Sequence, residues 1–174
     1  HPCALRIRTP DQIIGFDDHV YGHFSQQLHH EVGDFVLKRA DGFIAYQLAV
    51  VVDDAFQGVN QIVRGADLLD NTPRQLYLQQ LMGYPTPDYA HIPLVLAANG
   101  QKLSKQTLAP ALSQATDIVL SNLLKAWCFL GQQLPPDAEF LTPRMFWDWA
   151  IHQWHLQKIT TSPSFTAIRS IESS

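Results

Sequence analysis

The sequence predicts an α/β fold in which strands come first and helices last. Short apolar or alternating runs at residues 4–8, 12–16, 34–38 and 61–64 are typical of strands, and Gly and Asp turn residues separate them. Beyond Pro110, apolar residues recur at helical spacing. The first third of the chain is therefore expected to be rich in β-structure and the last third to be helical.

Local signals mark the ends of individual helices. Thr72 and Gln75 predict a capping box at a helix start, and Gly83 predicts the end of that helix. Gly131 predicts the end of a second helix. Thr142, followed by a proline at the first helical position, predicts the start of a third.

Two further apolar segments are interpreted as extended. Residues 91–96 predict a short buried strand in which Pro93 lies at an edge or a bulge. Residues 46–54 end in Asp53 and Asp54, whose side chains would point to opposite faces of an extended chain. That arrangement argues against a Mg²⁺ site shared by the two carboxylates.

Length and composition indicate a globular protein with one core, or a core and a small satellite domain. The 174 residues are 46% apolar and carry a net charge of −4. No apolar run approaches the ~20 residues of a membrane span, and the N-terminus has no basic stretch followed by an apolar region, as an export signal would. A cytoplasmic protein without a membrane partner is therefore expected. The charge does not indicate a strongly basic nucleic-acid-binding surface, although a local basic surface would suffice for brief contact with RNA.

A lysine-containing loop bears most directly on chemistry. It follows an apolar run and a glycine and consists of Lys102, Leu103, Ser104, Lys105 and Gln106. Two lysines separated by two residues can place ammonium groups against a polyphosphate and stabilise the charge that develops there. Taken alone, such a loop is more often a solvated turn.

Arg64 and Tyr46 are candidate ligands for a substrate. The planar guanidinium of Arg64 can hold a carboxylate through two charge-assisted hydrogen bonds, and Tyr46 can add a hydroxyl group. Taken alone, a surface salt bridge for Arg64 and a half-buried aromatic side chain for Tyr46 are the simpler interpretations.

Several blocks of sequence together resemble the glutamyl-tRNA synthetase family of class I aminoacyl-tRNA synthetases, in the order and spacing of that family. The blocks are DFVLKR at 34–39, YQLAVVVDD at 46–54, IVRGAD at 62–67, NTPRQ at 71–75, HIPL at 91–94, and the loop at 102–106, which is similar to the KMSKS-type signature. The resemblance implies the C-terminal part of a Rossmann-like catalytic domain with an inserted β-rich segment over residues 1–112. A small helical region would follow over residues 113–174.

The resemblance also implies roles for the candidate residues. It places Tyr46 and Arg64 at a bound glutamate, and it makes Lys102 and Lys105 the catalytic lysines of an ATP-binding loop, with Mg²⁺ held largely by the ATP phosphates. Cys3 resembles the last ligand of a zinc site whose other ligands would precede residue 1. The HIGH-type ATP motif of the family would also precede residue 1, so a nucleotide-binding half is expected there.

The segment after the loop indicates one branch of this family. Only 68 residues follow Gln106, too few for the anticodon-binding domains of a full glutamyl-tRNA synthetase, and residues 107–112 and 129–133 resemble the glutamyl-Q branch. That branch implies ATP-dependent activation of L-glutamate and its transfer to queuosine in the anticodon loop of tRNA(Asp), by a protein expected to be a monomer. Two alternatives stay open: a catalytic-domain fragment of a canonical glutamyl-tRNA synthetase, and a non-catalytic, synthetase-like RNA-binding paralogue.

Overall fold

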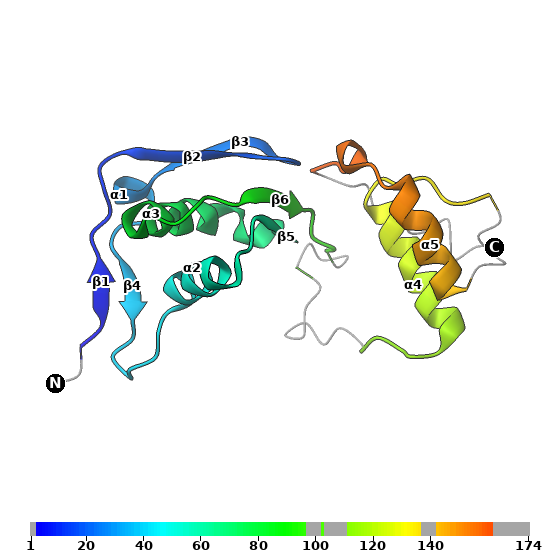
Figure 1. The fold of residues 1–174 in the computed structure, drawn as a ribbon, viewed down its shortest axis with the longest axis horizontal. Helices are drawn as coiled ribbons and strands as arrows, with labels where there is room; N and C mark the ends of the chain where they lie inside the picture. Colours follow the sequence, from blue (N-terminus) through cyan, green and yellow to red (C-terminus); the bar gives the residue numbers. More distant parts are fainter. Residues whose placement is uncertain (1–2, 97–101, 103–110, 137–141, 162–174) are drawn as a thin grey trace. The chain divides into compact units, whose positions relative to one another are not determined.

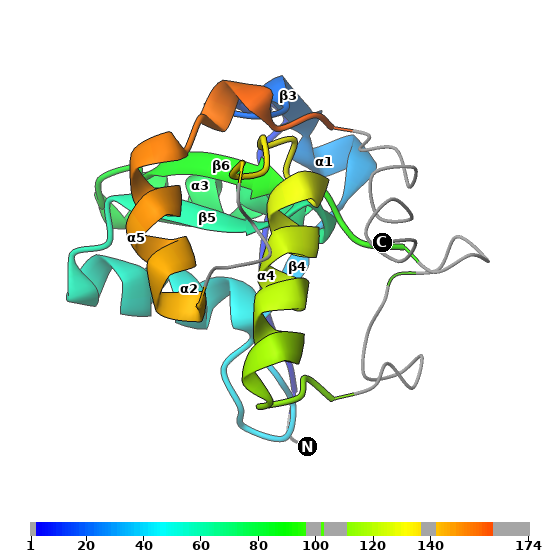
Figure 2. The same cartoon turned by 90° about the vertical axis from the view of Figure 1, so that its right-hand side faces the viewer.

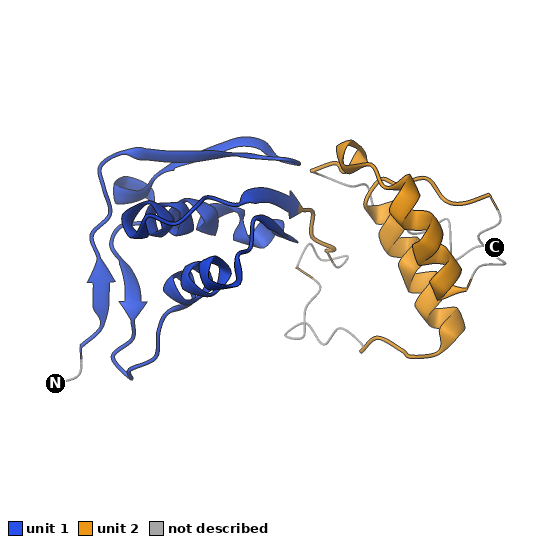
Figure 3. Ribbon diagram, viewed as in Figure 1, with its two compact units in different colours: residues 1–91 blue, residues 92–174 orange. Residues whose placement is uncertain are grey.

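The computed structural model describes residues 3–96, 102, 111–136 and 142–161, which belong to two compact units (Figure 1). Unit 1 comprises residues 1–91 and unit 2 residues 92–174 (Figure 3). Unit 1 combines strands with helices, and the secondary structure described in unit 2 is mainly helical. The predicted α/β class is thus confirmed. The division into compact units falls after His91. It describes packing and does not test the domain boundary expected after residue 112, which stays a prediction.

The strands described in unit 1, over residues 3–91, form two sheets. The first pairs two antiparallel strands, β1 (Leu5–Ile7) and β4 (Phe35–Lys38). The second has the strand order β3-β2-β6-β5 and consists of β2 (Ile13–Asp18), β3 (Gly22–Gln27), β5 (Gln61–Gly65) and β6 (Asp88–Ile92). β2 and β3 form an antiparallel hairpin, whereas β2 and β6 pair in parallel at Asp18 and Tyr89. The second sheet is therefore mixed, and the β2–β6 pair brings distant parts of the sequence together.

Helices pack on these strands and form a separate pair in unit 2. In unit 1 they are α1 (Leu28–Glu31), α2 (Tyr46–Gln57), the 3₁₀ helix η1 (Ala66–Asn71) and α3 (Thr72–Met82). Among the described residues of unit 2 they are α4 (Thr116–Phe129), α5 (Pro143–Gln153) and the 3₁₀ helix η4 (Leu156–Lys158). Figure 2 shows α4 and α5 side by side. Among the described residues, no helix combines the length and the apolar composition that crossing a membrane would require.

Helix α3 is the central element of the unit 1 core. Leu76 belongs to one cluster of buried apolar side chains and Leu78 to another, so the helix is covered on more than one side. Its partners in the two clusters are Ile14, Leu28 and Tyr89 in the first and Phe35 and Val51 in the second. Both clusters, and with them β2, β4, β6 and α2, thus depend on the position of α3.

Unit 2 has its own small core, and two of its sequence signals behave as predicted. Trp127 of α4 packs against Phe146 and Ala150 of α5. The Thr142 hydroxyl oxygen accepts a hydrogen bond from the backbone N–H of Met145 at 3.2 Å, so the predicted helix cap is confirmed. Gly131 follows the end of α4 with a φ of 73°, and a Cβ at this position would overlap the carbonyl oxygen of Lys158.

The interpretation of residues 46–54 as extended is wrong, because they lie in helix α2. Three successive valines favour a strand by intrinsic propensity. In the fold, Val51 is 2% exposed and, with the partly buried Leu48 one helical turn away, packs in the cluster that includes Leu78. Packing against α3 therefore overrides the local preference.

Two other local predictions are also wrong. The strand expected at residues 91–96 is β6 (Asp88–Ile92), and Pro93 lies beyond its end. The capping box at Thr72 does not form, because η1 runs directly into α3 and Asn71 has helical backbone angles (φ −83°, ψ −24°) with no side-chain cap. The side chains of Thr72 and Gln75 bond instead to Arg64 and Gln47.

The central role of α3 leads to a prediction about stability. Replacing Leu78, which is 1% exposed, by Ala is expected to lower the free energy of unfolding by about 2–5 kcal/mol, because it removes buried methyl groups and leaves a cavity. The same change at Leu81, which lies on the same helix and is 58% exposed, is expected to cost less than about 1 kcal/mol. Urea unfolding of both variants measures the difference, and equal losses would contradict the role assigned to α3.

Candidate functional site

Four polar side chains from four elements of unit 1 meet in a network that is largely buried. Asp18 ends β2, Arg64 lies in β5, Thr72 begins α3 and His91 lies in β6. Asp18, Thr72 and His91 are buried, and Arg64 is half-buried. The neighbouring positions of β2, β6 and β5 in one sheet bring three of these residues together, and the first turn of α3 adds the fourth.

The Asp18 carboxylate is the anchor of the network. Its Oδ1 accepts hydrogen bonds from the backbone N–H groups of Val20 and Tyr21, both at 2.9 Å, and from that of His91 at 3.2 Å. Its Oδ2 accepts from the same His91 N–H at 2.9 Å and lies 2.6 Å from His91 Nδ1. A buried carboxylate requires such a set of donors, so Asp18 fixes both the turn after β2 and the position of His91.

The contacts of His91 determine its tautomer. Arg64 Nε carries a hydrogen and lies 3.0 Å from His91 Nε2, so Nε2 must be the acceptor. The ring proton is then on Nδ1 and is donated to Asp18. Burial lowers the pKa of His91, which favours this neutral form, although hydrogen bonding and attraction to Asp18 partly oppose the effect.

Arg64 is held by neutral groups. Besides His91, its Nη2 donates to the Thr72 hydroxyl oxygen at 2.7 Å and makes a long contact of 3.5 Å with the carbonyl oxygen of Leu68. Its guanidinium carbon lies 5.5 Å from the centre of the Tyr89 ring, within cation–π range. None of the described groups that accept a hydrogen bond from Arg64 carries a negative charge. The guanidinium is therefore oriented by its neighbours and still able to bind an anion.

Tyr89 supports Arg64 from the core of the sheet. Its ring stacks on that of His91, with centroids 6.1 Å apart and planes 10° apart. Its hydroxyl oxygen accepts a hydrogen bond from Gln79 Nε2 at 3.1 Å. Burial raises the pKa of Tyr89, so it presents a neutral aromatic face to the cation.

Tyr46 begins α2 and is 52% exposed, so it is not the half-buried strand residue that was one of its two interpretations. The next residue, Gln47, ties this end of α2 to the start of α3, because Gln47 Oε1 accepts from Gln75 at 2.9 Å and Gln47 Nε2 donates to Asn71. The junction bound by Gln47 also carries Thr72, the partner of Arg64. No described hydrogen bond joins Tyr46 itself to Arg64.

The other predicted site residues lie outside this network or outside the described residues. Lys102 is exposed and pairs with Leu96 in an isolated antiparallel bridge. Leu103, Ser104, Lys105 and Gln106 lie outside the described residues. The arrangement of the KMSKS-type loop therefore stays a prediction.

The candidate metal ligands do not gather in the described part of the chain. Cys3 is exposed just before β1, and across residues 3–96, 102, 111–136 and 142–161 no three His, Cys, Asp or Glu side chains lie close enough to hold a metal ion. By themselves, the described residues thus do not fit a zinc site. Asp53 is exposed on α2, and burial raises the pKa of the half-buried Asp54, an effect that the charge of Arg64 partly offsets.

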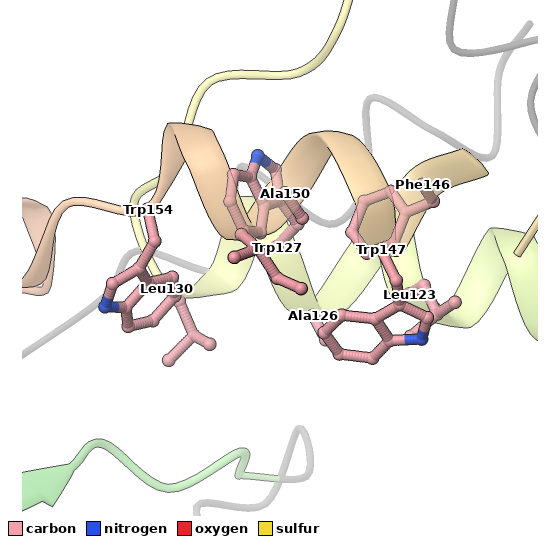
Figure 4. A pocket seen from close by; sticks show the side chains of 9 residues that line it. Leu123, Ala126, Trp127, Leu130, Phe146, Trp147, Ala150 and Trp154 are labelled. Carbon is pink, nitrogen blue, oxygen red and sulfur yellow. The ribbon is translucent and has the colours of Figure 1, made fainter. Parts of the chain in front are cut away.

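Unit 2 contains an apolar groove of about 210 Å³ between α4 and α5 (Figure 4). Its walls include Leu123 and Trp127 of α4, Trp147 and Ile151 of α5, and Trp154 just beyond α5. The groove offers hydrophobic contact but no titratable side chain among its lining residues. The polar network around Arg64 is therefore the better candidate for chemistry.

Sequence reasoning identified Arg64 but missed the groups that hold it. The sequence pattern gives Asp18 no role beyond a turn, places Thr72 in a helix cap, and includes His91 in a predicted strand and a family block without a role in the site. Two of them carry a signal in the sequence: His91 opens an apolar run, and Asp18 follows two residues after a predicted strand, so both are candidates for buried polar residues that need partners. Which partners they find depends on the pairing of β2 with β6.

Comparison with known proteins agrees with this architecture. Residues 1–163 match the family model described as tRNA synthetases class I (E and Q), catalytic domain. In solved structures, the chain is similar to the glutamate-tRNA synthetase from Elizabethkingia anophelis, with a TM-score of 0.72 and 24% identity over 97% of this chain and 38% of that one. This structural likeness supports the class I catalytic fold.

Curated relatives have much higher sequence identity. A glutamyl-Q tRNA(Asp) synthetase from Thiobacillus denitrificans is 52% identical over 161 residues, covering 92% of this chain and 52% of that protein. One from Neisseria meningitidis serogroup B is 54% identical over 156 residues, covering 90% of this chain and 52% of that protein. The chain thus spans about half the length of these relatives.

The role of Asp18 as an anchor predicts a large difference between two adjacent carboxylates. Asp18→Ala is expected to lower the free energy of unfolding by about 3–5 kcal/mol, because it leaves the two buried donors of His91 and the part-buried N–H groups of Val20 and Tyr21 without an acceptor. Asp17→Ala removes only an exposed contact with His23 at 2.8 Å and is expected to cost less than about 1 kcal/mol. Urea unfolding distinguishes the two, and a small loss for Asp18→Ala would contradict the anchoring role.

The burial of His91 predicts a loss of stability in mild acid. Its pKa in the fold is lower than the 6.5 of a free imidazole, so the unfolded chain binds more protons between these two values. The free energy of unfolding should therefore fall as the pH drops below about 6.5. His91→Gln lacks this titration, so the stability difference should shift in favour of the variant between about pH 7 and pH 5. Exposed histidines contribute equally to both proteins, and a pH-independent difference would refute the prediction.

Proposed function

Because this chain belongs to the class I tRNA synthetase (E and Q) catalytic-domain family, we propose that it forms part of a glutamyl-Q tRNA(Asp) synthetase. In the proposed reaction, the glutamate carboxylate attacks the α-phosphate of ATP and releases pyrophosphate. A queuosine hydroxyl of tRNA(Asp) then attacks the activated carbonyl carbon and releases AMP. Curated relatives with this name share about half of their aligned residues with the chain, which favours this function over tRNA charging.

The guanidinium of Arg64 is the observation that carries the proposal. It is oriented by His91, Thr72 and the Tyr89 ring, and these neighbours leave its positive charge unneutralised. A fixed planar cation of this kind suits a carboxylate ligand, because two parallel hydrogen bonds form without reorganising the side chain. We therefore assign Arg64 to a carboxylate of L-glutamate.

Tyr46 is the second proposed glutamate ligand. It is largely exposed at the first position of α2, where its hydroxyl can reach a ligand in solution. The hydrogen bonds of Gln47 hold this end of α2 against the start of α3, which carries a partner of Arg64. Tyr46 would thus offer its hydroxyl group to glutamate from the junction of α2 and α3, which also holds Arg64 through Thr72.

The ATP site is assigned to the loop of Lys102, Leu103, Ser104, Lys105 and Gln106. Its two lysines would stabilise negative charge on the phosphates during adenylate formation and pyrophosphate release. Mg²⁺ would enter with ATP, held mainly by phosphate oxygens. The exposure of Lys102 is compatible with a phosphate ligand.

A zinc ion at Cys3 is a separate part of the proposal. A structural zinc site usually has four ligands, so Cys3 could supply only one of them. No step of the proposed reaction depends on this ion. Metal analysis of the intact protein tests the assignment, and a zinc content near zero would reject it.

The proposed RNA partner is the anticodon loop of tRNA(Asp). Its queuosine base would enter the site in an unstacked form, as is usual for proteins that read single-stranded RNA. We place this reaction in the cytoplasm and expect a monomer to perform it. A canonical glutamyl-tRNA synthetase would instead charge tRNA(Glu), and a non-catalytic RNA-binding paralogue would not activate glutamate.

Replacing Arg64 by Lys tests the carboxylate assignment. The variant keeps the charge but loses the planar fork, so the KM for glutamate in ATP–pyrophosphate exchange is expected to rise about 10- to 100-fold. The matched control is Arg39→Lys, which changes an exposed arginine paired with Asp41 and is expected to leave exchange unchanged. An unaltered glutamate KM in Arg64→Lys would reject the assignment.

The tRNA used in the assay separates the alternatives. The intact protein is expected to transfer radiolabelled glutamate to tRNA(Asp) that contains queuosine, and not to the same tRNA without it. Glutamylation of tRNA(Glu) would identify a canonical charging enzyme. Absence of glutamate-dependent exchange would favour the RNA-binding paralogue.

A further inference from the structure

We propose that His91 is a positioning residue for glutamate binding: held by Asp18 as a neutral acceptor, it occupies one edge of the Arg64 guanidinium and leaves another edge for the substrate. This inference rests on the proposed function and deepens it. It adds a pair of buried residues, Asp18 and His91, that act through Arg64 without contacting glutamate.

The imidazole has almost no freedom to move. Asp18 Oδ2 accepts from Nδ1 at 2.6 Å, and the backbone N–H of His91 donates to the same oxygen at 2.9 Å. The ring also stacks on Tyr89, with planes 10° apart, and its side chain is fully buried. The lone pair on Nε2 is therefore aimed at a fixed point, the Nε–H group of Arg64.

The donors of Arg64 then divide into occupied and available groups. In a planar guanidinium, Nε and one terminal nitrogen share one edge, and the two terminal nitrogens share the other. His91 Nε2 and the Thr72 hydroxyl bind Nε and Nη2 at 3.0 and 2.7 Å, which fills the first edge with neutral acceptors. Within the described part of the chain, Nη1 makes no hydrogen bond, and Nη2 adds only the 3.5 Å contact with Leu68. The second edge is thus available for a carboxylate.

The neutrality of His91 is essential to this arrangement. A proton on Nε2 would place a second donor and a second positive charge against Arg64 Nε. The charged groups that act on His91 are Asp18 of β2, Arg64 of β5 and Asp67 of η1. Burial and Arg64 oppose protonation, while the two carboxylates favour it, and burial is the largest of these effects.

Two substitutions separate the bond of the ring to Asp18 from its bond to Arg64. The latter is made at Nε2, which also lies 3.3 Å from the Thr72 hydroxyl oxygen. The amide of His91→Asn lies near the former Nδ1 and can donate to Asp18, but it does not reach Arg64. The amide oxygen of His91→Gln lies near the former Nε2 and can accept from Arg64, but it gives up the donor to Asp18. Asn therefore keeps the anchor and Gln keeps the contact that orients the cation.

We expect His91→Asn to raise the glutamate KM in ATP–pyrophosphate exchange by about 10-fold or more, because a hydrogen bond to a charged group is lost. Its KM for ATP is expected to stay within about 2-fold. His91→Gln is expected to change the glutamate KM by less than about 3-fold. A His91→Asn enzyme with wild-type glutamate KM, or one in which the KM values for glutamate and ATP rise together, would overturn the positioning role.

An independent measurement on the unsubstituted protein tests the proposal even if the variants do not fold. Nitrogen-15 NMR of the unsubstituted protein at pH 7 is expected to show His91 protonated on Nδ1 and unprotonated on Nε2. The opposite tautomer, or an imidazolium, would overturn the proposal. The two proposals fail in different ways. If the unsubstituted protein shows no glutamate-dependent exchange, the proposed function is refuted. If it is active and His91→Asn has an unchanged glutamate KM, only the role of His91 is refuted.

Discussion

A carboxylate removed from water at the end of β2 sets the geometry of the site. Asp18 can remain buried only where several N–H groups converge on it, and they come from the following turn and from His91 of β6. The turn donors are local, whereas the parallel pairing of β2 with β6 at Asp18 and Tyr89 brings the donors of His91 to the carboxylate. One local requirement therefore fixes a non-local strand pair, and β5 joins the sheet on the far side of β6.

The network around Asp18 also changes in charge from its buried end to its half-buried end. A negative group lies at the closed end of the network, a neutral ring lies in the middle, and a cation lies at the half-buried end. Direct contact between Asp18 and Arg64 would have neutralised the cation. Placing His91 between them keeps the orientation that a salt bridge would give while leaving the positive charge for a ligand.

Sequence signals predicted those helix ends that depend only on neighbouring residues. The cap at Thr142 and the helix end at Gly83 formed where expected, because each depends on a few neighbouring backbone groups. Helix α2 was misjudged because packing against α3 outweighs the strand preference of its valines. Asp17 and Asp18 look alike in sequence, yet one is exposed and the other is the anchor, and only strand pairing distinguishes them. The family resemblance points to Arg64 but not to Asp18, Thr72 and His91, the residues that hold it.

The pairing of Asp18 with His91 also bears on how the chain acquires its structure. The two residues are 73 positions apart, so the carboxylate lacks its most important donors until β6 has been synthesised and docked. Closing a loop of this length carries an entropic cost that no earlier contact of Asp18 offsets. The β2–β3 hairpin can form early from neighbouring residues, but Asp18, the last residue of β2, would keep water around its charge. Dehydration of that carboxylate should thus be a late event, coincident with the assembly of the hydrogen bonds around Arg64.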